Sequence, residues 1–247
     1  MKAFLTFFTL LLFSGQTIYA KEYIVGVEHL DYLPQYGFDS NKRYDGLGIE
    51  VLRQFSKSND DIDFKFTPYP IKRLHQNLLL DEIDFKYPDS VHWNMSAKKK
   101  YDVIYSDNLV PYTDGILVLP KNNGRSYSDK FRVGIPLGFT PVALLNSSSN
   151  YKLQVIKKMK ISELIKLANL GRVDGIYINI DVGLHRLNQL GKSGTLVFDN
   201  NLPHINDYYQ LSTINHQGII NKLNQFIRSH PHLLSKLQAK YGIKPIK

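Results

Sequence analysis

The sequence predicts an α/β fold of two similar lobes, each a mostly parallel sheet wound by helices, joined by a two-strand hinge. One observation is a helix-turn-strand unit at residues 163–181, in which leucines at helical spacing lead to Gly171 and then to an apolar run. Such a glycine is typical of a left-handed helix end, and the short apolar run is typical of a buried strand. Residues 73–88 repeat the unit earlier in the chain, which indicates two lobes of similar build. The aligned pairs are Leu74 with Leu164, Leu80 with Leu170, Ile83 with Val173 and Asp84 with Asp174.

The N-terminal half alternates strands with helices. The β-branched and aromatic run Tyr23–His29 predicts a first strand, which leads into a polar, aromatic loop. Apolar residues on one face of 47–55 predict a helix, and the alternation in Ile62–Phe66 predicts a second strand. The first copy of the repeated unit follows. This order is typical of a parallel sheet with right-handed crossovers, whose strands point their carboxyl ends at the ligand site.

The second half begins a new winding. Two apolar runs, Val103–Tyr105 and Gly115–Leu119, are separated by Pro111 and Tyr112, and a fresh strand is predicted at Phe131–Ile135. The later predictions are a short helix ending at Leu145, a serine-rich loop at 146–150, a strand at Leu153–Ile156, the second repeated unit, a helix at Asp181–Leu190, strands at Thr195–Phe198 and Tyr208–Ile214, and helices at Gly218–Ile227 and His232–Tyr241.

The predicted organisation has four segments. They are a leader at 1–20, the first part of lobe 1 at 21–110, lobe 2 at 111–208 and a return to lobe 1 at 209–247. The chain is expected to pass between the lobes around 108–116 and again around 205–212. Two strand-like crossings of this kind form a hinge that bends without unfolding.

The N-terminus indicates export. Lys2 precedes an apolar run from Ala3 to Phe13, and Ala20 stands at a plausible cleavage point, so residues 1–20 are interpreted as a secretory signal peptide. The run is too short to cross a bilayer. The chain contains no cysteine, which excludes disulfides, thiolate metal sites and a lipid-attachment cysteine. We expect a monomeric periplasmic protein, and we interpret the net charge of +9 of the full sequence as a solvated basic surface rather than a nucleic-acid site.

Enzyme signatures are absent from the sequence. It holds no nucleophile elbow, no Walker loop, no glycine-rich dinucleotide motif and no zincin motif. The histidines are dispersed; His230 and His232 form the closest pair, at a predicted turn between helices. We therefore expect no metal and no cofactor.

Candidate ligand-binding residues stand at the expected ends of strands and starts of helices. The guanidinium of Arg73, near a helix start, can hold a carboxylate, although a surface arginine explains the same position. The loop aromatics Tyr32, Tyr87 and Trp93 can form the walls of a small-molecule site or anchor their loops. Gly138 and Thr140 precede a predicted helix, whose exposed amides favour an anion. Asp181 can accept a ligand hydrogen bond or cap its helix. The full candidate set is Tyr32, Arg73, Tyr87, Trp93, Lys99, Gly138, Thr140, Asn179 and Asp181.

Taken in order, these pieces make residues 21–245 resemble the periplasmic solute-binding proteins of the amino-acid-binding family, which have the type 2 fold. The resemblance depends on "YDGLGIEVL" for the opening helix, "LLLDEIDF", "YSD" at Tyr105–Asp107, "FRVGIPLGFT", "LGRVDGIYIN", "YYQLSTI" and the closing "INKLNQFI" and "LSKLQAKYGI". It implies two lobes that close on a small solute and present the closed form to an ABC transporter permease or a sensor in the inner membrane.

Two departures from the family pattern concern the ligand. The family's carboxylate-binding arginine aligns with Lys99, and its amine-binding aspartate aligns with Asn179. Loss of that aspartate removes the charged partner of an α-ammonium, and charge-assisted hydrogen bonds are roughly twice as strong as neutral ones. The resemblance therefore implies a small polar or anionic ligand, amino-acid-like or an organic acid, that does not require an amine.

Two other functions stay open. The family is known to include periplasmic dehydratases that act on cyclic carboxylic acids, and Glu50, Asp181 or His92 would then be the candidate acid or base. A sensor or interaction protein without a transport role is the third possibility. Fold alone does not separate these functions.

Overall fold

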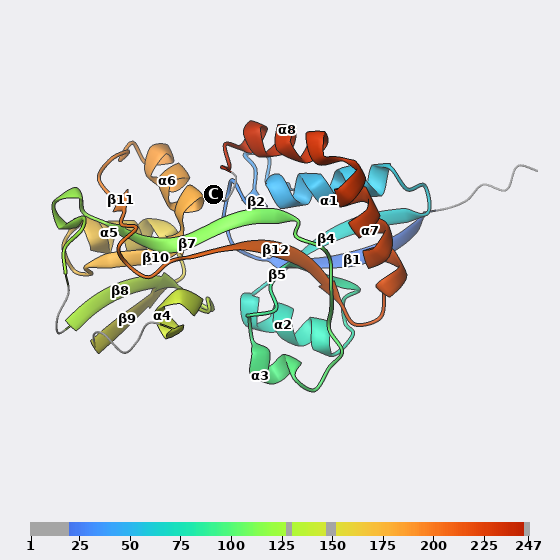
Figure 1. Ribbon diagram of the computed structural model, residues 1–247, viewed down its shortest axis with the longest axis horizontal. Coiled ribbons are helices and arrows are strands. Elements are labelled where there is room, and N and C mark those ends of the chain that lie inside the picture. Colours follow the sequence, from blue (N-terminus) through green and yellow to red (C-terminus); the bar gives the residue numbers. More distant parts are fainter. Residues whose placement is uncertain (1–19, 127–129, 147–151, 245–247) are drawn as a thin grey trace, which may run out of the picture.

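Two long strands connect the two lobes of the molecule. The structure, a computed structural model, describes residues 20–126, 130–146 and 152–244. β7 (Val110–Val118) and β12 (Ile205–Thr213) are antiparallel to each other and run from one lobe into the other (Figure 1). β7 includes both Pro111 and Tyr112, as expected of a strand-like crossing around 108–116. Pro111 is the second residue of the strand, near its start, where a missing backbone donor is tolerated.

The sheet of lobe 1 is mostly parallel, as predicted. β1 (Lys21–Glu28) lies between β4 (Ile62–Tyr69) and β5 (Phe85–Asp89) and is parallel to both. β5 and the short β6 (Ile104–Tyr105) pair antiparallel with the second half of β12. The helices of this lobe are α1 (Leu47–Lys57), α2 (Ile71–Leu79), α3 (Met95–Lys98), α7 (Gln217–Ser229) and α8 (Pro231–Tyr241), with a small hairpin of β2 (Gly37–Phe38) and β3 (Tyr44–Asp45).

The sheet of lobe 2 is built in the same way. β8 (Lys130–Pro136) is parallel to β9 (Lys152–Lys158) and to β10 (Gly175–Asn179), and β10 pairs antiparallel with β7. The short β11 (Val197–Phe198) also pairs with β7. The helices are α4 (Val142–Asn146), α5 (Ile161–Asn169) and α6 (Ile180–Gln189), with a short 3-10 turn, η1 (Pro120–Asn122).

The predicted repeat is visible in atomic detail. The carboxylate of Asp84 accepts the backbone N–H of Ile24 at 2.7 Å, and the amide of Asp84 donates to the Ile24 carbonyl at 3.1 Å. Asp174 makes the same two bonds to Arg132, at 2.8 and 2.7 Å. In both lobes the turn before this aspartate thus ties β5 or β10 to its neighbouring strand, so the duplicated sequence has the same structural task in each copy.

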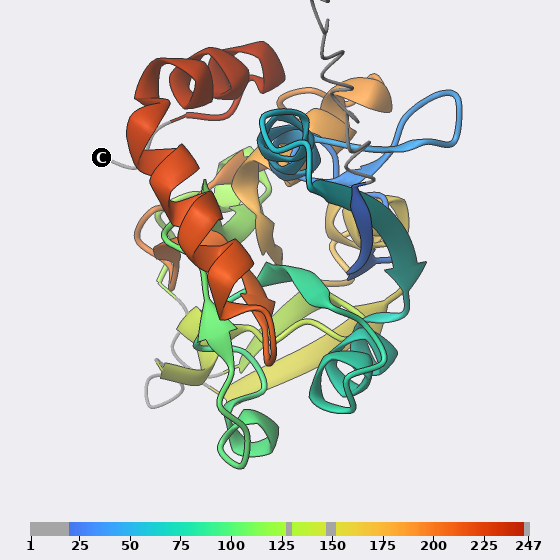
Figure 2. The ribbon, with the colours of Figure 1, turned by 90° about the vertical axis from the view of Figure 1, so that its right-hand side faces the viewer.

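The C-terminal helices α7 and α8 pack against α1 and other elements of lobe 1. Figure 2 views this lobe from its outer end and shows α7 and α8 along one side of it. The buried side chain of Phe226 on α7 packs against Phe55 of α1, with ring centroids 5.7 Å apart. No helix of the described residues is long and apolar enough to cross a membrane. The predicted signal peptide falls on residues 1–19 and most of the serine-rich loop on 147–151, which lie outside the described residues.

Candidate functional site

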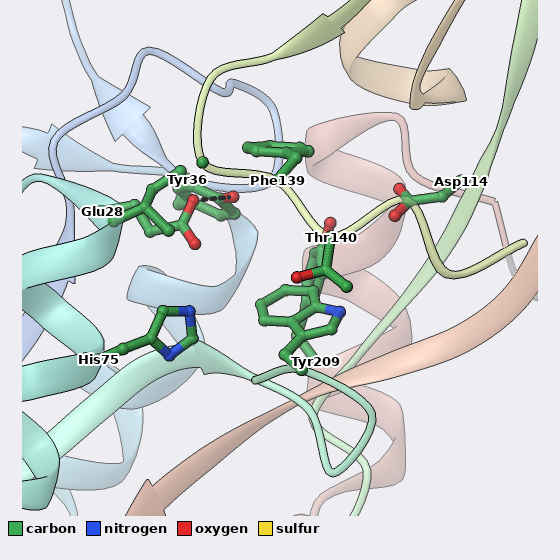
Figure 3. Close-up of a pocket in the computed structure, with 10 residues that line it drawn as sticks. Glu28, Tyr36, His75, Asp114, Phe139, Thr140 and Tyr209 are labelled. Atoms are coloured by element: carbon green, nitrogen blue, oxygen red, sulfur yellow. Dashed lines mark hydrogen bonds between the residues drawn. The ribbon is translucent and has the colours of Figure 1, made fainter. Parts of the chain in front are cut away.

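A small cavity lies where the two lobes and the hinge meet (Figure 3). Lobe 1 contributes the end of β1 and the start of α2, the hinge contributes side chains of β7 and β12, and lobe 2 contributes the loop after β8. The lining residues are Glu28, Tyr36, Ile71, His75, Trp93, Asp114, Gly138, Phe139, Thr140 and Tyr209. The cavity measures about 20 Å³, enough for about one water molecule, so the lobes are closed around it.

Direct contacts hold the lobes together beside the cavity. The backbone N–H of Asn179 in lobe 2 donates to the hydroxyl of Tyr32 in lobe 1 at 3.0 Å. The Tyr32 ring also meets Phe139 of lobe 2 edge to face, with centroids 5.2 Å apart. Farther out, Arg186 forms an ion pair with Asp31. A bond, a ring contact and an ion pair thus define the closed state.

Glu28 is the last residue of β1 and is fully buried at the cavity wall. Tyr36 donates a hydrogen bond to its carboxylate at 2.7 Å. Burial raises the pKa of Glu28 to about 7, against the opposing effect of the nearby Lys86. Glu28 therefore exchanges its proton near neutral pH.

A buried ion cluster lies behind Glu28. The ammonium groups of Lys86 and Lys98 approach the same oxygen of Asp89, at 2.9 and 2.7 Å, and Ser212 donates to the other oxygen at 2.6 Å. Burial alone would raise the pKa of Asp89, but the two lysines hold it at about 2. Asp89 is thus the permanent anion to which both buried lysines are bound.

Asp114 lies on β7, opposite Glu28 across the cavity, with Phe139 and Thr140 between them (Figure 3). Its side chain is fully buried, and one carboxylate oxygen has no hydrogen-bond partner. Burial raises the pKa of Asp114 to about 7, with further contributions from Glu28 and Asp207. Of the two carboxyl groups in the cavity wall, Asp114 is the one with an oxygen that lacks a hydrogen-bond partner.

His75 also lines the cavity but carries no charge. Burial, helped by Lys86, lowers its pKa to about 3, and its Nδ1 atom has no partner. The rest of the wall is largely aromatic: Trp93 packs against Tyr209 at 5.8 Å, and Tyr209 stacks on Tyr112 at 4.2 Å. No group of three or more potential metal ligands occurs within the residues described.

Six of the nine predicted ligand residues lie at or next to the cavity. Trp93, Gly138 and Thr140 line it. Tyr32 and Tyr87 are buried in the aromatic layer around Tyr36, at 5.0 and 6.3 Å from its ring. Asn179 touches this layer through the bond of its N–H to Tyr32, while its side chain caps α6 by accepting from Val182 at 3.0 Å.

The other three lie away from the cavity. Arg73 has a side chain that is 66% exposed and lies 4.0 Å from Glu82, because Ile71 and His75, on the opposite face of α2, take the cavity side. Lys99 is exposed, whereas its neighbour Lys98 turns inward to Asp89. Asp181 lies in the first turn of α6, where burial raises its pKa.

The acid or base candidates of the enzyme hypothesis also differ in position. Glu50 accepts from Gln54 on α1 at 2.7 Å, and His92 lies 3.9 Å from Asp207; neither lines the cavity. The carboxyl groups that do are Glu28 and Asp114, which the sequence analysis missed. For Glu28 a signal exists, since it is the second-last residue of the predicted strand Tyr23–His29, at the expected ligand edge of the sheet.

Comparisons with known proteins identify the fold. No protein-family model matches the chain, and no curated protein does. Among solved structures, a mutant of ArgBP from T. maritima is similar with a TM-score of 0.69 at 16% identity over 89% of this chain and 94% of that one. A His/Glu/Gln/Arg/opine family-binding protein from Silicibacter pomeroyi, solved with lysine, gives 0.68 at 15% over 89% and 96%.

A third similar structure is the ancestral amino acid-binding protein AncCDT-1, a precursor of cyclohexadienyl dehydratase. Its TM-score is 0.68 at 18% identity, over 89% of this chain and 94% of that one. All three matches span both lobes and the hinge. The chain therefore matches periplasmic amino-acid-binding proteins in structure and has the type 2 periplasmic binding protein fold that its sequence predicts.

Proposed function

We propose that this protein is a periplasmic solute-binding protein that closes its two lobes on a small polar ligand and presents the closed form to an ABC transporter. One observation carries the proposal: both lobes and both hinge strands contribute residues to one cavity, whose wall combines aromatic rings with Glu28, His75 and Asp114. A cavity of this kind is the usual ligand site of two-lobed α/β proteins.

Closure is the proposed mechanism. Bending of β7 and β12 separates the lobes and admits the ligand, which then contacts Glu28 and His75 on one side and Phe139 and Thr140 on the other. A ligand that touches both walls binds the closed state more tightly and shifts the population toward it. The cavity of about 20 Å³ has room for about one water molecule, so a bound solute must hold the lobes farther apart than they are in this ligand-free state.

The sequence and the fold both support a proposed cellular setting. The predicted leader directs the chain to the periplasm, and similar structures include the substrate binding protein of an amino acid ABC transporter. Others of the similar structures hold lysine or arginine. We therefore propose an amino-acid-like solute, a transporter permease or membrane sensor as partner, and a monomeric binding protein.

A thermal-shift screen of residues 21–247 against amino acids, amines, organic acids and sugars tests the proposal. A ligand at one hundred times its Kd adds about 2.7 kcal/mol, a shift of about 5 °C or more for a chain of this size. Trp93 is the only tryptophan and lines the cavity, so its fluorescence reports binding at the site itself. The proposal would be contradicted if no compound in the library changed the melting temperature or the Trp93 fluorescence.

Catalysis in the same cavity is the second candidate, and the proton exchange of Glu28 and Asp114 near neutral pH favours it. Buried carboxyl groups with a raised pKa are suited to act as general acids. Incubation with cyclic carboxylic acids, followed by product analysis, separates turnover from stoichiometric binding. Turnover that disappears in Glu28→Gln and Asp114→Asn would favour the enzyme.

A further inference from the structure

The cavity wall has acidic groups but no available cation. Glu28 and Asp114 line it, and the one basic side chain in the lining, His75, is held neutral by burial. Lys86 and Lys98 are both bound to Asp89 behind the wall. A ligand carboxylate in this cavity would therefore meet carboxyl groups and find no charged partner among the lining residues.

The two acidic groups differ in how far the protein satisfies them. Glu28 accepts a hydrogen bond from Tyr36 and has Lys86 nearby. Asp114 lies on a hinge strand, is fully buried, and leaves one oxygen without a donor, while its charged neighbours are the acids Glu28 and Asp207. A buried acceptor without a donor is unfavourable in the empty protein, and a ligand N–H that reaches it removes this penalty.

The aromatic wall suits the same kind of ligand. Trp93, Tyr36 and Tyr209 surround the cavity, and aromatic faces attract ammonium and guanidinium groups within about 6 Å. One cation–π contact of this kind already exists within the protein, since the ammonium of Lys86 lies 5.3 Å from the centre of the Trp93 ring. Carboxyl groups and aromatic faces thus favour positive charge from several sides.

We infer that the cavity binds a compact organic cation, an ammonium or guanidinium compound without a carboxylate. Its N–H groups would donate mainly to Asp114 and also to Glu28. This inference rests on the proposed function and names the ligand class of the same site. It replaces the expectation of an anionic ligand, for which Arg73 and Lys99 were the candidate positive charges, because the structure directs both side chains away from the cavity.

Amines and their parent amino acids provide a matched test, because each pair differs only by the carboxylate. The pairs are 1,4-diaminobutane with ornithine, agmatine with arginine, and n-butylamine with 2-aminopentanoic acid. Titrations of the full mature chain at pH 8, followed by Trp93 fluorescence and calorimetry, give a dissociation constant for each compound. We expect at least one amine to bind about tenfold or more tightly than its parent, which corresponds to about 1.4 kcal/mol.

The variant Asp114→Asn tests the contact. It keeps the shape of the side chain but removes the charge, and we expect it to weaken amine binding by about tenfold or more. The matched control is Asp63→Asn, at an exposed position of β4, which should bind amines like the wild type. The comparison of amines with parents uses the wild-type chain, so it stands even if Asp114→Asn folds poorly.

The outcomes separate the inference from the proposed function. Tight binding of amino or organic acids with no preference for amines would overturn the inference and leave a solute-binding protein. Equal amine affinity in Asp114→Asn and Asp63→Asn would also overturn it. Absence of binding by every compound, acids and sugars included, would overturn the proposed function and the inference together.

Discussion

The two lobes share one scaffold but differ in what they bring to the cavity. In each, an aspartate after the helix-turn ties the next strand to its neighbour, Asp84 to Ile24 and Asp174 to Arg132. The strand that follows ends differently. β5 ends in the buried Asp89 with its two lysines, whereas β10 ends in Asn179, which is uncharged and caps α6.

This difference separates the parts of the chain that set the fold from those that set the chemistry. The repeated turn fixes where each strand points, and the residues at the carboxyl end are then free to differ. Lobe 1 and the hinge carry the charged wall, Glu28 and Asp114, while lobe 2 supplies Phe139 and Thr140 as an uncharged cover. The comparison of the lobes therefore predicts unequal responses to matched substitutions.

The largest difference is expected between Asp89→Asn and Asp174→Asn. Asp89 is fully buried, and its neutralisation leaves two buried ammonium groups without an anion, which costs about 3–5 kcal/mol. The side chain of Asp174 is 21% exposed and its partner Arg132 reaches solvent, so its loss costs about 1 kcal/mol. Urea unfolding measures both. Equal losses of unfolding free energy would contradict the difference in burial between the two aspartates.

The second effect is a pH dependence produced by Asp114. Its pKa is about 7 in the folded protein against 3.8 for a free carboxyl group, so the folded state binds the proton more tightly. The contribution of this group to the free energy of unfolding is complete below about pH 4. It is lost as pH rises from about 4 to 7, and each unit by which the two pKa values differ corresponds to about 1.4 kcal/mol.

Comparison with Asp114→Asn is needed because two other buried groups titrate: Glu28, whose pKa is also raised to about 7, acts in the same direction, and His75, with its lowered pKa, acts in the opposite direction below pH 6.5. We expect the variant's unfolding free energy, relative to the wild type, to rise between pH 5 and pH 8. The same titration should show cation binding to the wild type strengthening over this range, as Glu28 and Asp114 ionise. A difference in stability that does not change with pH would contradict the raised pKa of Asp114.

The third comparison concerns two equivalent glycines in the sheets. A methyl group added at Gly26 of β1 would lie 2.5 Å from Ile83 and 2.6 Å from Leu74. At Gly134 of β8 it would lie 2.9 Å from Leu164. Overpacking of this kind costs about 1–3 kcal/mol, and we expect Gly26→Ala near the upper end and Gly134→Ala near the lower. Thermal unfolding ranks the two; the reverse order would be inconsistent with tighter packing in lobe 1.

The smallest effect is expected from Tyr32→Phe, which removes the hydroxyl that accepts the N–H of Asn179 across the lobes. The bond contributes about 0.5–1.5 kcal/mol to closure, so the ligand-free variant should open further and show a larger radius of gyration. Tyr44→Phe is the control, since its hydroxyl donates to the Glu28 carbonyl within lobe 1. An equal radius of gyration in both variants would argue against Tyr32 as a latch.

Most of the fold was predictable, because hydrophobic periodicity and the turn glycine mark the elements and the repeat. Gly171 has a φ of 64°, and Asp81 takes the same left-handed conformation in the first copy, with a φ of 58°. The two strand-like crossings expected around 108–116 and 205–212 correspond to β7 and β12. The residue boundaries of the lobes, the signal peptide and the monomeric state stay predictions.

The site was less predictable, because it depends on which face of a helix turns inward. Arg73 and Ile71 are two positions apart, and so lie on opposite faces of α2. Lys98 and Lys99 differ by one position, yet only Lys98 finds the buried Asp89. Asp114 interrupts an apolar strand and, from sequence, is indistinguishable from a surface residue. Buried charges of this kind follow no periodicity.

The lobes are expected to open and close around this cavity, and a measured distance between them reports this motion. The chain has no cysteine, so Lys57→Cys on lobe 1 and Lys192→Cys on lobe 2, both exposed, give two specific label sites. We predict that the tightest-binding compound of the matched pairs narrows the interlobe distance distribution toward its shortest values. A distribution that does not change while the same compound saturates the Trp93 fluorescence signal would contradict the account.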